Sequence, residues 1–437
     1  MKKFYPIAVF LSLSSTTAFA AWDGTDSPWT KGDGSENNPY LIENEQQLSF
    51  FQKSVTEGET YEGKYILLAA DLDMGAGNGM IFNPIGFHNV YTAENKEYDE
   101  SKTFLGTFDG GYHTIDNANI TLAEPDTDEI GGVGLFALGK QQTVIKNVIL
   151  GSGSTVDGSS SADVAGIVGI SYGCTVINCM NSAKILGGSF ETGGITGFAG
   201  KGTTIDGCVN NGNIITHSSS GGIAGASENA TISNCYSTGE ISAEDAYMVG
   251  GIIGWANMQT TISNCYVTSA IKGSPGSSWM PGISPVVAEF ERSTAKNCYY
   301  VEALTGCKPL SNQNGVKGIT EAELKSEATV TALNGITEGT WVLGHDGYPT
   351  LAWEAGTASV ESTFADALNV TFGISGGTVF VTTDSSSATF LVYDVAGHVV
   401  YSAPVLNGSA GYAPAAGGVY IAVVITPEGK AVRKISL

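Results

Sequence analysis

A segment of about 30 residues recurs along the middle of this 437-residue chain, and it restricts the fold more than any other feature. The copies are HTIDNANI (113–120), TVIKNVIL (143–150), CTVINCMN (174–181), TTIDGCVN (203–210), ATISNCYS (230–237), TTISNCYV (260–267) and STAKNCYY (293–300). A glycine-rich motif recurs in phase as GGVGLF from 131, AGIVG from 165, GGITGF from 193, GGIAGA from 221, GGIIGW from 250 and a degraded PGISP from 281. Two motifs locked to one period indicate a repeat architecture.

Each repeat holds short β-branched runs separated by Gly or Asn, and none shows a long helical period. Three such strands would make one coil of a right-handed parallel β-helix, with the strands of successive coils about 4.8 Å apart. One coil cannot bury its own face, but a stack buries a continuous core. A propeller blade needs about 40 residues or more, so the period disfavours a propeller.

Equivalent residues of the repeat should stack as columns along such a solenoid. The isoleucines expected to point into the core are Ile177, Ile205, Ile232 and Ile262. The aligned column Asn117, Asn147, Asn178, Gly207, Asn234, Asn264 and Asn297 is expected at a turn. Asn tolerates a left-handed backbone and its stacked amides can bond coil to coil, while Gly adopts positive φ without strain.

Two segments beside the repeats predict helices that close the ends of the solenoid, where unpaired strand edges need caps. In NEQQLSFFQKSV, Asn44 is the expected N-cap and Gln47 holds the capping-box position. In TEAELKSEATVTALNG, Thr320 and Glu323 form a capping box and Gly335 stops the helix.

The N-terminus reads as an export signal over residues 1–20, with Lys2 and Lys3, a short apolar run and a small-residue AFA site. No other segment is expected to cross a membrane as a helix. With 14% charged and 42% hydrophobic residues, the chain is not expected to be disordered. Its net charge of −23 favours solubility and opposes binding to nucleic acid.

The glycine-rich repeats resemble those of GLUG-motif proteins, named for a Gly–hydrophobic–hydrophobic–Gly core. The flanking sequences resemble the same proteins, and they are GDGSENNPYLIENEQQLSFF (32–51), YILLAADLDM (65–74), FNPIGF (82–87), FLGTFDGGYHTI (104–115) and LGHDGYPTLAWE (343–354). The resemblance spans roughly residues 22–355. It implies an extracellular β-helix of adhesin-like character and implies no catalytic activity.

Residues 366–437 have a different pattern, of short strands separated by turns, and are expected to form a small β-sandwich of six or seven strands. Its segments VYDVAGHVVY (392–401), PAAGGVYIAVV (414–424) and KAVRKISL (430–437) resemble C-terminal sorting domains of the type IX secretion pathway. That resemblance implies transport across an outer membrane and release or attachment at the cell surface. A generic sandwich domain is the alternative.

These observations divide the chain into six parts. The expected parts are a signal peptide (1–20), an N-terminal cap with the first coils (21–120), GLUG-type repeats (121–302), a C-terminal cap (303–355), a linker (356–365) and the sandwich (366–437).

Seven cysteines are present, and five of them occupy one repeat column: Cys179, Cys208, Cys235, Cys265 and Cys298. Cysteines stacked in register would lie about 4.8 Å apart, which is within the range for a disulfide, but this spacing does not guarantee the Cβ geometry that a disulfide requires. A single file does not converge on a zinc ion, and no aligned His or cation would activate a thiol. Buried packing thiols are the expectation, with disulfides between adjacent coils or between Cys298 and Cys307 as the alternative.

Other isolated matches to reactive or metal-binding patterns are expected to be structural. Asp33 and Glu36, like Asp71 and Asp73, could bind calcium through oxygens but match no EF-hand loop, so turn and cap roles are expected. Ser171 in GISYG matches the sequence pattern of a nucleophile elbow but not its structural context, because a β-repeat follows where a helix is required. We therefore expect no catalytic, cofactor-binding or metal site.

One column suits ligand binding better. Tyr236, Tyr266 and Tyr299 follow the cysteine in three successive coils and should point outward by strand alternation. An exposed tyrosine strip could stack on sugars, or it could be an aromatic ladder that only stabilises the coils.

The sequence therefore predicts a secreted or outer-membrane-surface adhesin-like protein. We expect a monomer that binds a glycan or an extracellular protein ligand, with the C-terminal domain engaging secretion machinery. The alternatives are a carbohydrate-active β-helix enzyme, a polysaccharide lyase or glycoside hydrolase, and a purely structural envelope protein. Few cations and no carboxylate pair at one-coil spacing disfavour the enzyme.

Overall fold

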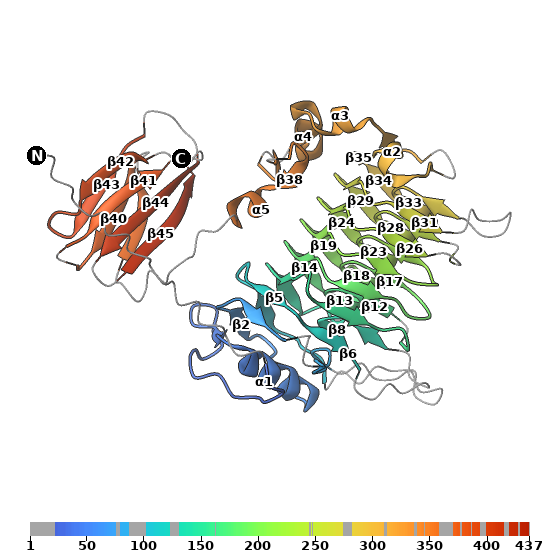
Figure 1. The fold of residues 1–437 in the computed structure, drawn as a ribbon, viewed down its shortest axis with the longest axis horizontal. Helices are drawn as coiled ribbons and strands as arrows, with labels where there is room; N and C mark the ends of the chain where they lie inside the picture. The colour runs from blue at the N-terminus through green and yellow to red at the C-terminus, as the bar shows by residue number, and fades with distance from the viewer. Residues whose placement is uncertain are drawn as a thin grey trace, which may run out of the picture. The chain divides into compact units, whose positions relative to one another are not determined.

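The computed structural model describes residues 22–75, 79–86, 102–122, 131–357 and 370–436, apart from short gaps in the last two ranges. The chain forms two compact units, Met1–Leu351 and Ala352–Leu437. The expected signal peptide and most of the expected linker lie outside the described residues. The first unit is a parallel β-solenoid, visible as the stack of short arrows in Figure 1.

Five parallel sheets run along the solenoid. Sheet 1 contains β1 (Tyr40–Ile42), β2 (Tyr65–Leu68), β4 (Thr107–Asp109), β9 (Val144–Lys146), β14 (Thr175–Ile177), β19 (Thr204–Asp206), β24 (Thr231–Ser233), β29 (Thr261–Ser263) and β34 (Thr294–Lys296). Sheet 2 contains β3 (Leu72–Asp73), β5 (Thr114–Asp116), β10 (Ile149–Leu150), β15 (Met180–Asn181), β20 (Val209–Asn210), β25 (Tyr236–Ser237), β30 (Tyr266–Val267), β35 (Cys298–Tyr300) and β36 (Val316–Gly318).

The remaining three sheets have six strands each. Sheet 3 contains β6 (Asn119–Thr121), β11 (Thr155–Asp157), β16 (Lys184–Leu186), β21 (Ile214–Ile215), β26 (Ile241–Ala243) and β31 (Ile271–Gly273). Sheet 4 contains β7 (Gly132–Val133), β12 (Asp163–Ala165), β17 (Thr192–Gly193), β22 (Ser220–Gly221), β27 (Val249–Gly250) and β32 (Ile283–Ser284). Sheet 5 contains β8 (Phe136–Gly139), β13 (Val168–Tyr172), β18 (Thr196–Gly200), β23 (Ala224–Glu228), β28 (Ile253–Asn257) and β33 (Val287–Phe290).

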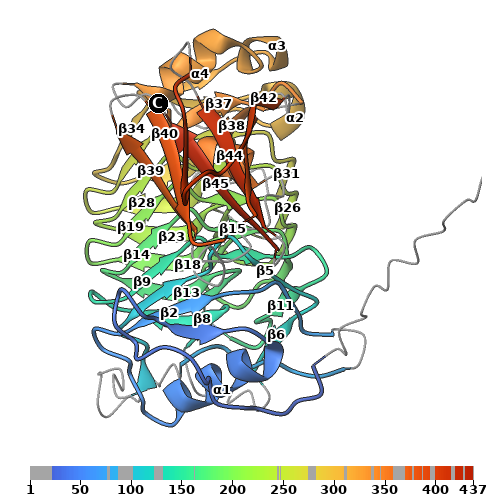
Figure 2. The same ribbon diagram turned by 90° about the vertical axis from the view of Figure 1, so that its left-hand side faces the viewer.

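A complete coil therefore carries five short strands, as in β9 to β13, where three were predicted (Figure 2). The additional corners arise in the glycine-rich motif. A Cβ built on Gly193 would lie 1.9 Å from the carbonyl oxygen of Thr196, and one on Gly250 would lie 1.9 Å from that of Ile253. Because only glycine fits such an approach, the motif marks a sharp bend between sheets 4 and 5.

The solenoid core consists of stacked aliphatic residues from successive coils. Ile205, Ile232 and Ile262 are buried as predicted. The prediction is wrong for Ile177, because Val176 is the residue in register with Ile205, while Ile177 pairs with Asp206 on the outward face. Strand alternation allows only one of two neighbours to face the core.

The N-terminal cap is built around helix α1 (Glu45–Thr56). Its N-cap Asn44 accepts a hydrogen bond from the Gln47 backbone N–H at 3.0 Å, as predicted. The reciprocal bond departs from a capping box, because Gln47 Oε1 accepts from the Glu43 N–H at 2.6 Å instead of from Asn44. Buried Phe51 on the inner face stacks on Phe108 of β4, which anchors the helix to the first coils.

The C-terminal cap contains three helices, α2 (Glu302–Thr305), α3 (Glu321–Leu324) and α4 (Glu327–Asn334). The Thr320–Glu323 capping box is present, and Gly335 with φ 58° ends α4. The single helix predicted here is broken, because Ser326 is extended and caps α4 by accepting from the Thr329 N–H at 3.3 Å. A hairpin of β37 (Trp341–Leu343) and β38 (Pro349–Leu351) completes this unit.

The second unit begins with α5 (Ala352–Thr357) and continues as a sandwich of two antiparallel sheets. One sheet holds β39 (Val370–Ser375), β40 (Thr378–Thr383) and β43 (Ser409–Tyr412), and the other holds β41 (Thr389–Tyr393), β42 (Val399–Pro404), β44 (Val419–Thr426) and β45 (Gly429–Ser436). Both sheets contribute to one buried core, with Phe372 and Val381 on one side and Phe390 and Val424 on the other. In neither unit do the described helices reach the length and apolarity that a membrane span requires.

Candidate binding surfaces

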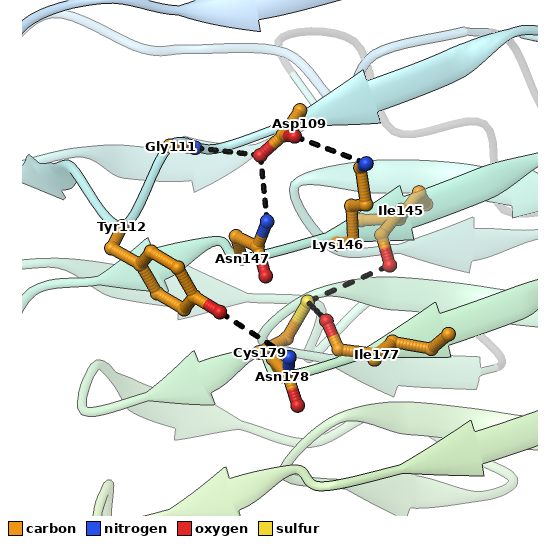
Figure 3. A network of polar contacts seen from close by, with 9 residues as sticks. All are labelled: Asp109, Gly111, Tyr112, Ile145, Lys146, Asn147, Ile177, Asn178 and Cys179. Carbon is orange, nitrogen blue, oxygen red and sulfur yellow. Dashed lines mark hydrogen bonds and ion pairs between the residues drawn. The ribbon is translucent and has the colours of Figure 1, made fainter. Parts of the chain in front are cut away.

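The asparagine column forms the corner between sheets 1 and 2. All six asparagines have φ between 52° and 57°, and Gly207 has φ 64°, so the predicted left-handed turn is confirmed in every copy. Asn147 Nδ2 donates to Asp109 Oδ1 at 2.8 Å, and Asn178 Nδ2 donates to the Tyr112 hydroxyl at 3.3 Å (Figure 3). Each corner is thereby tied to an earlier coil.

The predicted amide-to-amide bonding between stacked asparagines is only partly right. Asn297 Nδ2 donates to Asn264 Oδ1 at 3.2 Å, but Asn234 Nδ2 donates to the carboxylate of Asp206 at 2.8 Å. Asp109 also accepts from the Gly111 N–H and pairs with Lys146 at 3.2 Å (Figure 3). Carboxylates provide the stronger, charge-assisted bonds of this corner, so its role is structural.

All seven cysteines are free and buried, in agreement with the expected packing role. In the file of five, each Sγ donates to the carbonyl two residues earlier, for example Cys235 to Ser233 at 3.0 Å and Cys265 to Ser263 at 3.2 Å. Figure 3 shows the same bond for Cys179. A carbonyl oxygen only accepts, so a cysteine that makes this bond does so as a thiol.

The pKa values of the cysteines shift in both directions. Against the effect of burial, hydrogen bonds with neighbouring thiols lower the pKa of Cys208 to about 5 and that of Cys265 well below its usual value, but both side chains are fully buried and out of reach of a substrate. Burial raises the pKa of the Cys174 thiol to about 11, and burial likewise raises the pKa of Cys307 to about 11. Nucleophilic and metal-binding cysteines need the opposite shift. Among the described residues, no group of three or more His, Cys, Asp or Glu side chains is arranged to hold a metal ion.

The tyrosine column points outward as predicted, but the exposed strip is wrong for Tyr236 and Tyr266. Their rings stack at 4.8 Å, and Trp341 of the C-terminal hairpin packs against both, at 5.9 and 5.6 Å. Tyr266 donates through its hydroxyl to the Pro349 carbonyl at 2.8 Å, and only 7% of Tyr236 and 2% of Tyr266 remain exposed. Tyr299, in register with Tyr266, is half-buried.

Three of the four acidic residues noted in the sequence accept local hydrogen bonds. Asp71 Oδ1 accepts from the Thr114 N–H at 2.8 Å and contacts His113 Nδ1 at 3.1 Å, and Asp73 accepts from the Gly75 N–H at 3.0 Å. A bond from Ser35 lowers the pKa of the Asp33 carboxyl to about 2, as expected for a turn aspartate.

Ser171 is not placed for nucleophilic attack. It is fully buried in β13, where its hydroxyl lies 3.0 Å from that of Thr196. A nucleophile elbow requires an exposed hydroxyl at a strand-to-helix turn, and a continuous strand does not supply one.

A second row of outward residues lies on sheet 5, and the sequence reasoning missed it. Ile170, Phe198, Ala226 and Trp255 follow one another in register on β13, β18, β23 and β28. Phe198 and Trp255 are half-buried, whereas Ile170 and Ala226 are buried outside the solenoid core. A detectable signal existed, because GGITGF and GGIIGW carry an aromatic residue where GGIAGA has alanine.

These outward residues lie along the bend between sheets 4 and 5. A Cβ built on Gly132 of β7 would meet Ile170 Cγ1 at 3.0 Å, so this side chain packs against the neighbouring sheet. One coil further along, a Cβ built on Gly197 would lie 3.0 Å from the carbonyl carbon of Asp163. In the coil after that, a Cβ built on Gly225 would lie 2.9 Å from the carbonyl carbon of Glu191. We call Asp163, Glu191, Phe198, Ala226 and Trp255 the outer groove.

Asp163 is the unusual member of the outer groove. Only 8% of the residue is exposed, and its Oδ1 has no hydrogen-bond partner within the described part of the chain. Asp163 lies in register with Glu191 of the next coil, so the expectation that no carboxylate pair occurs at one-coil spacing is wrong here. Burial, and secondarily the neighbouring Glu191, raises the pKa of Asp163 well above its usual value.

The fold and its repeated corners define a class, the parallel β-solenoids. The GLUG motif model matches residues 216–242, which extend from just before β22 into β26. A 167-residue stretch is 29% identical to halomucin of Haloquadratum walsbyi, covering 38% of this chain and only 2% of halomucin.

A crystal structure shares the architecture of the chain. It is that of a Bacteroides ovatus protein provisionally described as an immunoglobulin A1 protease. The match has a TM-score of 0.54 at 22% identity and covers 74% of this chain and 95% of the other. At that identity the likeness shows the fold alone.

Proposed function

We propose that this protein is a non-catalytic, surface-associated binding protein of the adhesin type, which presents its solenoid to a glycan or another extracellular ligand. The observation that carries this proposal is the register of the coils, which repeats one kind of side chain along an outward face. On sheet 1 the in-register residues Thr175, Thr204, Thr231, Thr261 and Thr294 form such a row. A polymer with its own repeat is the natural ligand for a repeating surface.

The proposed location rests on several sequence features. The predicted signal peptide, the GLUG motif and the stretch similar to halomucin support export to the cell surface or medium. The absence of catalysis is part of the proposal. It is supported by the burial of the cysteines and by the burial of Ser171 in a strand.

The direct test uses the full chain without residues 1–20 on an array of glycans and extracellular-matrix proteins. We expect saturable binding to at least one class of ligand, and no release of reducing ends or peptides from any bound ligand. No binding to either class would contradict the proposal, and turnover of a bound glycan would favour the enzyme alternative.

We further propose that the C-terminal sandwich directs export, on the strength of its resemblance to type IX sorting domains. Deletion of residues 366–437 in the native host should leave the solenoid folded but trapped inside the outer membrane. Surface labelling and cell fractionation measure this outcome, and unchanged delivery of the truncated chain would show that the sandwich has another role.

A further inference from the structure

The outer groove offers two features of saccharide recognition on the outside of the solenoid. Phe198 and Trp255 stand two coils apart in one column, about 9.6 Å from backbone to backbone, with the methyl group of Ala226 between them. Aromatic faces that remain partly exposed can stack on the C–H face of a sugar ring. Because Ala226 is fully buried, a ligand would lie across both rings and would not enter between them.

The carboxyl pair supplies the polar half of such a site. The backbones of Asp163 and Glu191 lie beside Phe198 and Ala226, since a Cβ built on Gly197 or Gly225 would come within 3.0 Å of their carbonyl carbons. A protonated Asp163 carboxyl offers a hydroxyl donor, and the oxygens of the two side chains also offer acceptors. A sugar hydroxyl also donates and accepts, so it is chemically matched to the pair.

The cost of the carboxyl pair argues against a purely structural role. A buried carboxyl with an unpartnered oxygen destabilises the fold by about 1–3 kcal/mol. The equivalent positions in the two adjacent coils are glycine and serine, Gly132 and Ser219, so the solenoid does not need an acid there. Expensive polar groups concentrate where a protein meets a ligand.

Charge around the outer groove selects among saccharides. Glu228 pairs in register with Asn257, and Glu289 with Trp255, so further carboxylates lie on the same sheet. Lys201 places a positive charge over the Tyr172 ring that packs against Phe198, but Glu191, Glu228 and Glu289 outnumber it. A uronate or sulfated chain would be repelled by these carboxylates.

We propose that the outer groove binds a neutral saccharide chain, with sugar rings stacked on Phe198 and Trp255 and a hydroxyl bonded to the Asp163–Glu191 pair. This inference rests on the proposed binding function and assigns it to one surface. It moves the ligand from the tyrosine column, which the C-terminal hairpin covers, to sheet 5.

The test measures binding of cellohexaose, chitohexaose and mannohexaose to the full chain without residues 1–20, by titration calorimetry. Oligogalacturonate serves as the charged probe. We expect one neutral hexasaccharide to bind and oligogalacturonate not to bind. Trp255→Ala, Phe198→Ala and Glu191→Gln should each weaken binding roughly tenfold or more.

Tyr299→Ala is the matched control, because it removes a half-buried aromatic ring from sheet 2 and should leave the affinity unchanged. Thermal unfolding of every variant confirms that the fold persists. Neutral-sugar binding that survives Trp255→Ala and Phe198→Ala would overturn the outer groove while leaving the binding function intact. Binding of matrix proteins with none of the hexasaccharides bound at millimolar concentration would overturn the saccharide and keep the adhesin proposal. If the unmodified chain bound neither saccharides nor matrix proteins, both the outer-groove proposal and the adhesin-type binding function would be overturned.

Discussion

Two aromatic rows run along the solenoid on different sheets, and they differ in what lies over them. On sheet 2, Trp341 packs on the stacked rings of Tyr236 and Tyr266, and all three side chains are buried. On sheet 5, Phe198 and Trp255 remain partly exposed beside a carboxyl pair. The same residue chemistry therefore closes the end of the fold in one place and is available to a ligand in the other.

The largest difference should appear when one tryptophan is removed from each row. Trp341→Ala deletes a side chain that is 99% buried, and truncation of such a residue typically costs about 3–5 kcal/mol. Trp255→Ala removes a half-buried ring and should cost about 1 kcal/mol or less. Hydrogen exchange of sheet 2 and urea unfolding measure both effects. Equal losses would erase the proposed distinction between the rows.

A smaller effect should distinguish the two rows through the pH dependence of stability, because a buried carboxyl, Asp163, lies beside the row on sheet 5. The raised pKa of Asp163 means that the folded state binds a proton more tightly than the unfolded state. The contribution of Asp163 to the free energy of unfolding should therefore fall as the pH rises from the ordinary aspartate pKa of about 4 through the raised pKa of the folded state. Asp163→Asn should raise stability at pH 8, by about 1–3 kcal/mol, and leave it nearly unchanged at pH 4.

Denaturant midpoints of Asp163→Asn and the unmodified chain at the two pH values provide the measurement. Asp33→Asn is the matched control for a carboxyl that is shifted in the opposite direction at an exposed turn. A pH profile that is identical with and without Asp163 would show that the buried carboxyl has no linkage to folding.

The smallest effect concerns the hydroxyl that ties the tyrosine row to its cover. Tyr266→Phe removes the bond to the Pro349 carbonyl and leaves that acceptor unpaired, which should cost about 0.5–1.5 kcal/mol. Tyr299→Phe, in the next coil, should change stability little. Thermal unfolding of the two variants compares them directly, and a larger loss for Tyr299→Phe would place the cover elsewhere.

Local chemistry made the repeated corner predictable. Asn and Gly are the residues that take a left-handed backbone without strain, and every aligned position does so, from Asn117 to Asn297. The outward direction of the tyrosines also followed from strand alternation. The same rule, applied to the register of Ile205, identifies Val176 as the core residue in place of Ile177.

The covering of the tyrosine row was not predictable from local patterns. Trp341 is separated from Tyr266 by 74 residues, which include strands β31 to β36 and helices α2, α3 and α4. The sequence around Trp341 does not indicate which residues it packs against. The pairing of Asp163 with Glu191 depends likewise on the register between coils of unequal length. Long-range packing decides which outward residues stay accessible, and a repeat alignment alone does not contain that information.

The asparagine corners have a consequence for how such chains can change over generations. Each corner is closed by contacts to neighbouring coils, so duplication of the 30 residues from Asn234 to Asn264 would insert one coil and rejoin equivalent partners. Both end caps would keep their contacts. The height of the molecule would then grow or shrink in increments of about 4.8 Å, which makes its reach a heritable quantity adjustable one coil at a time.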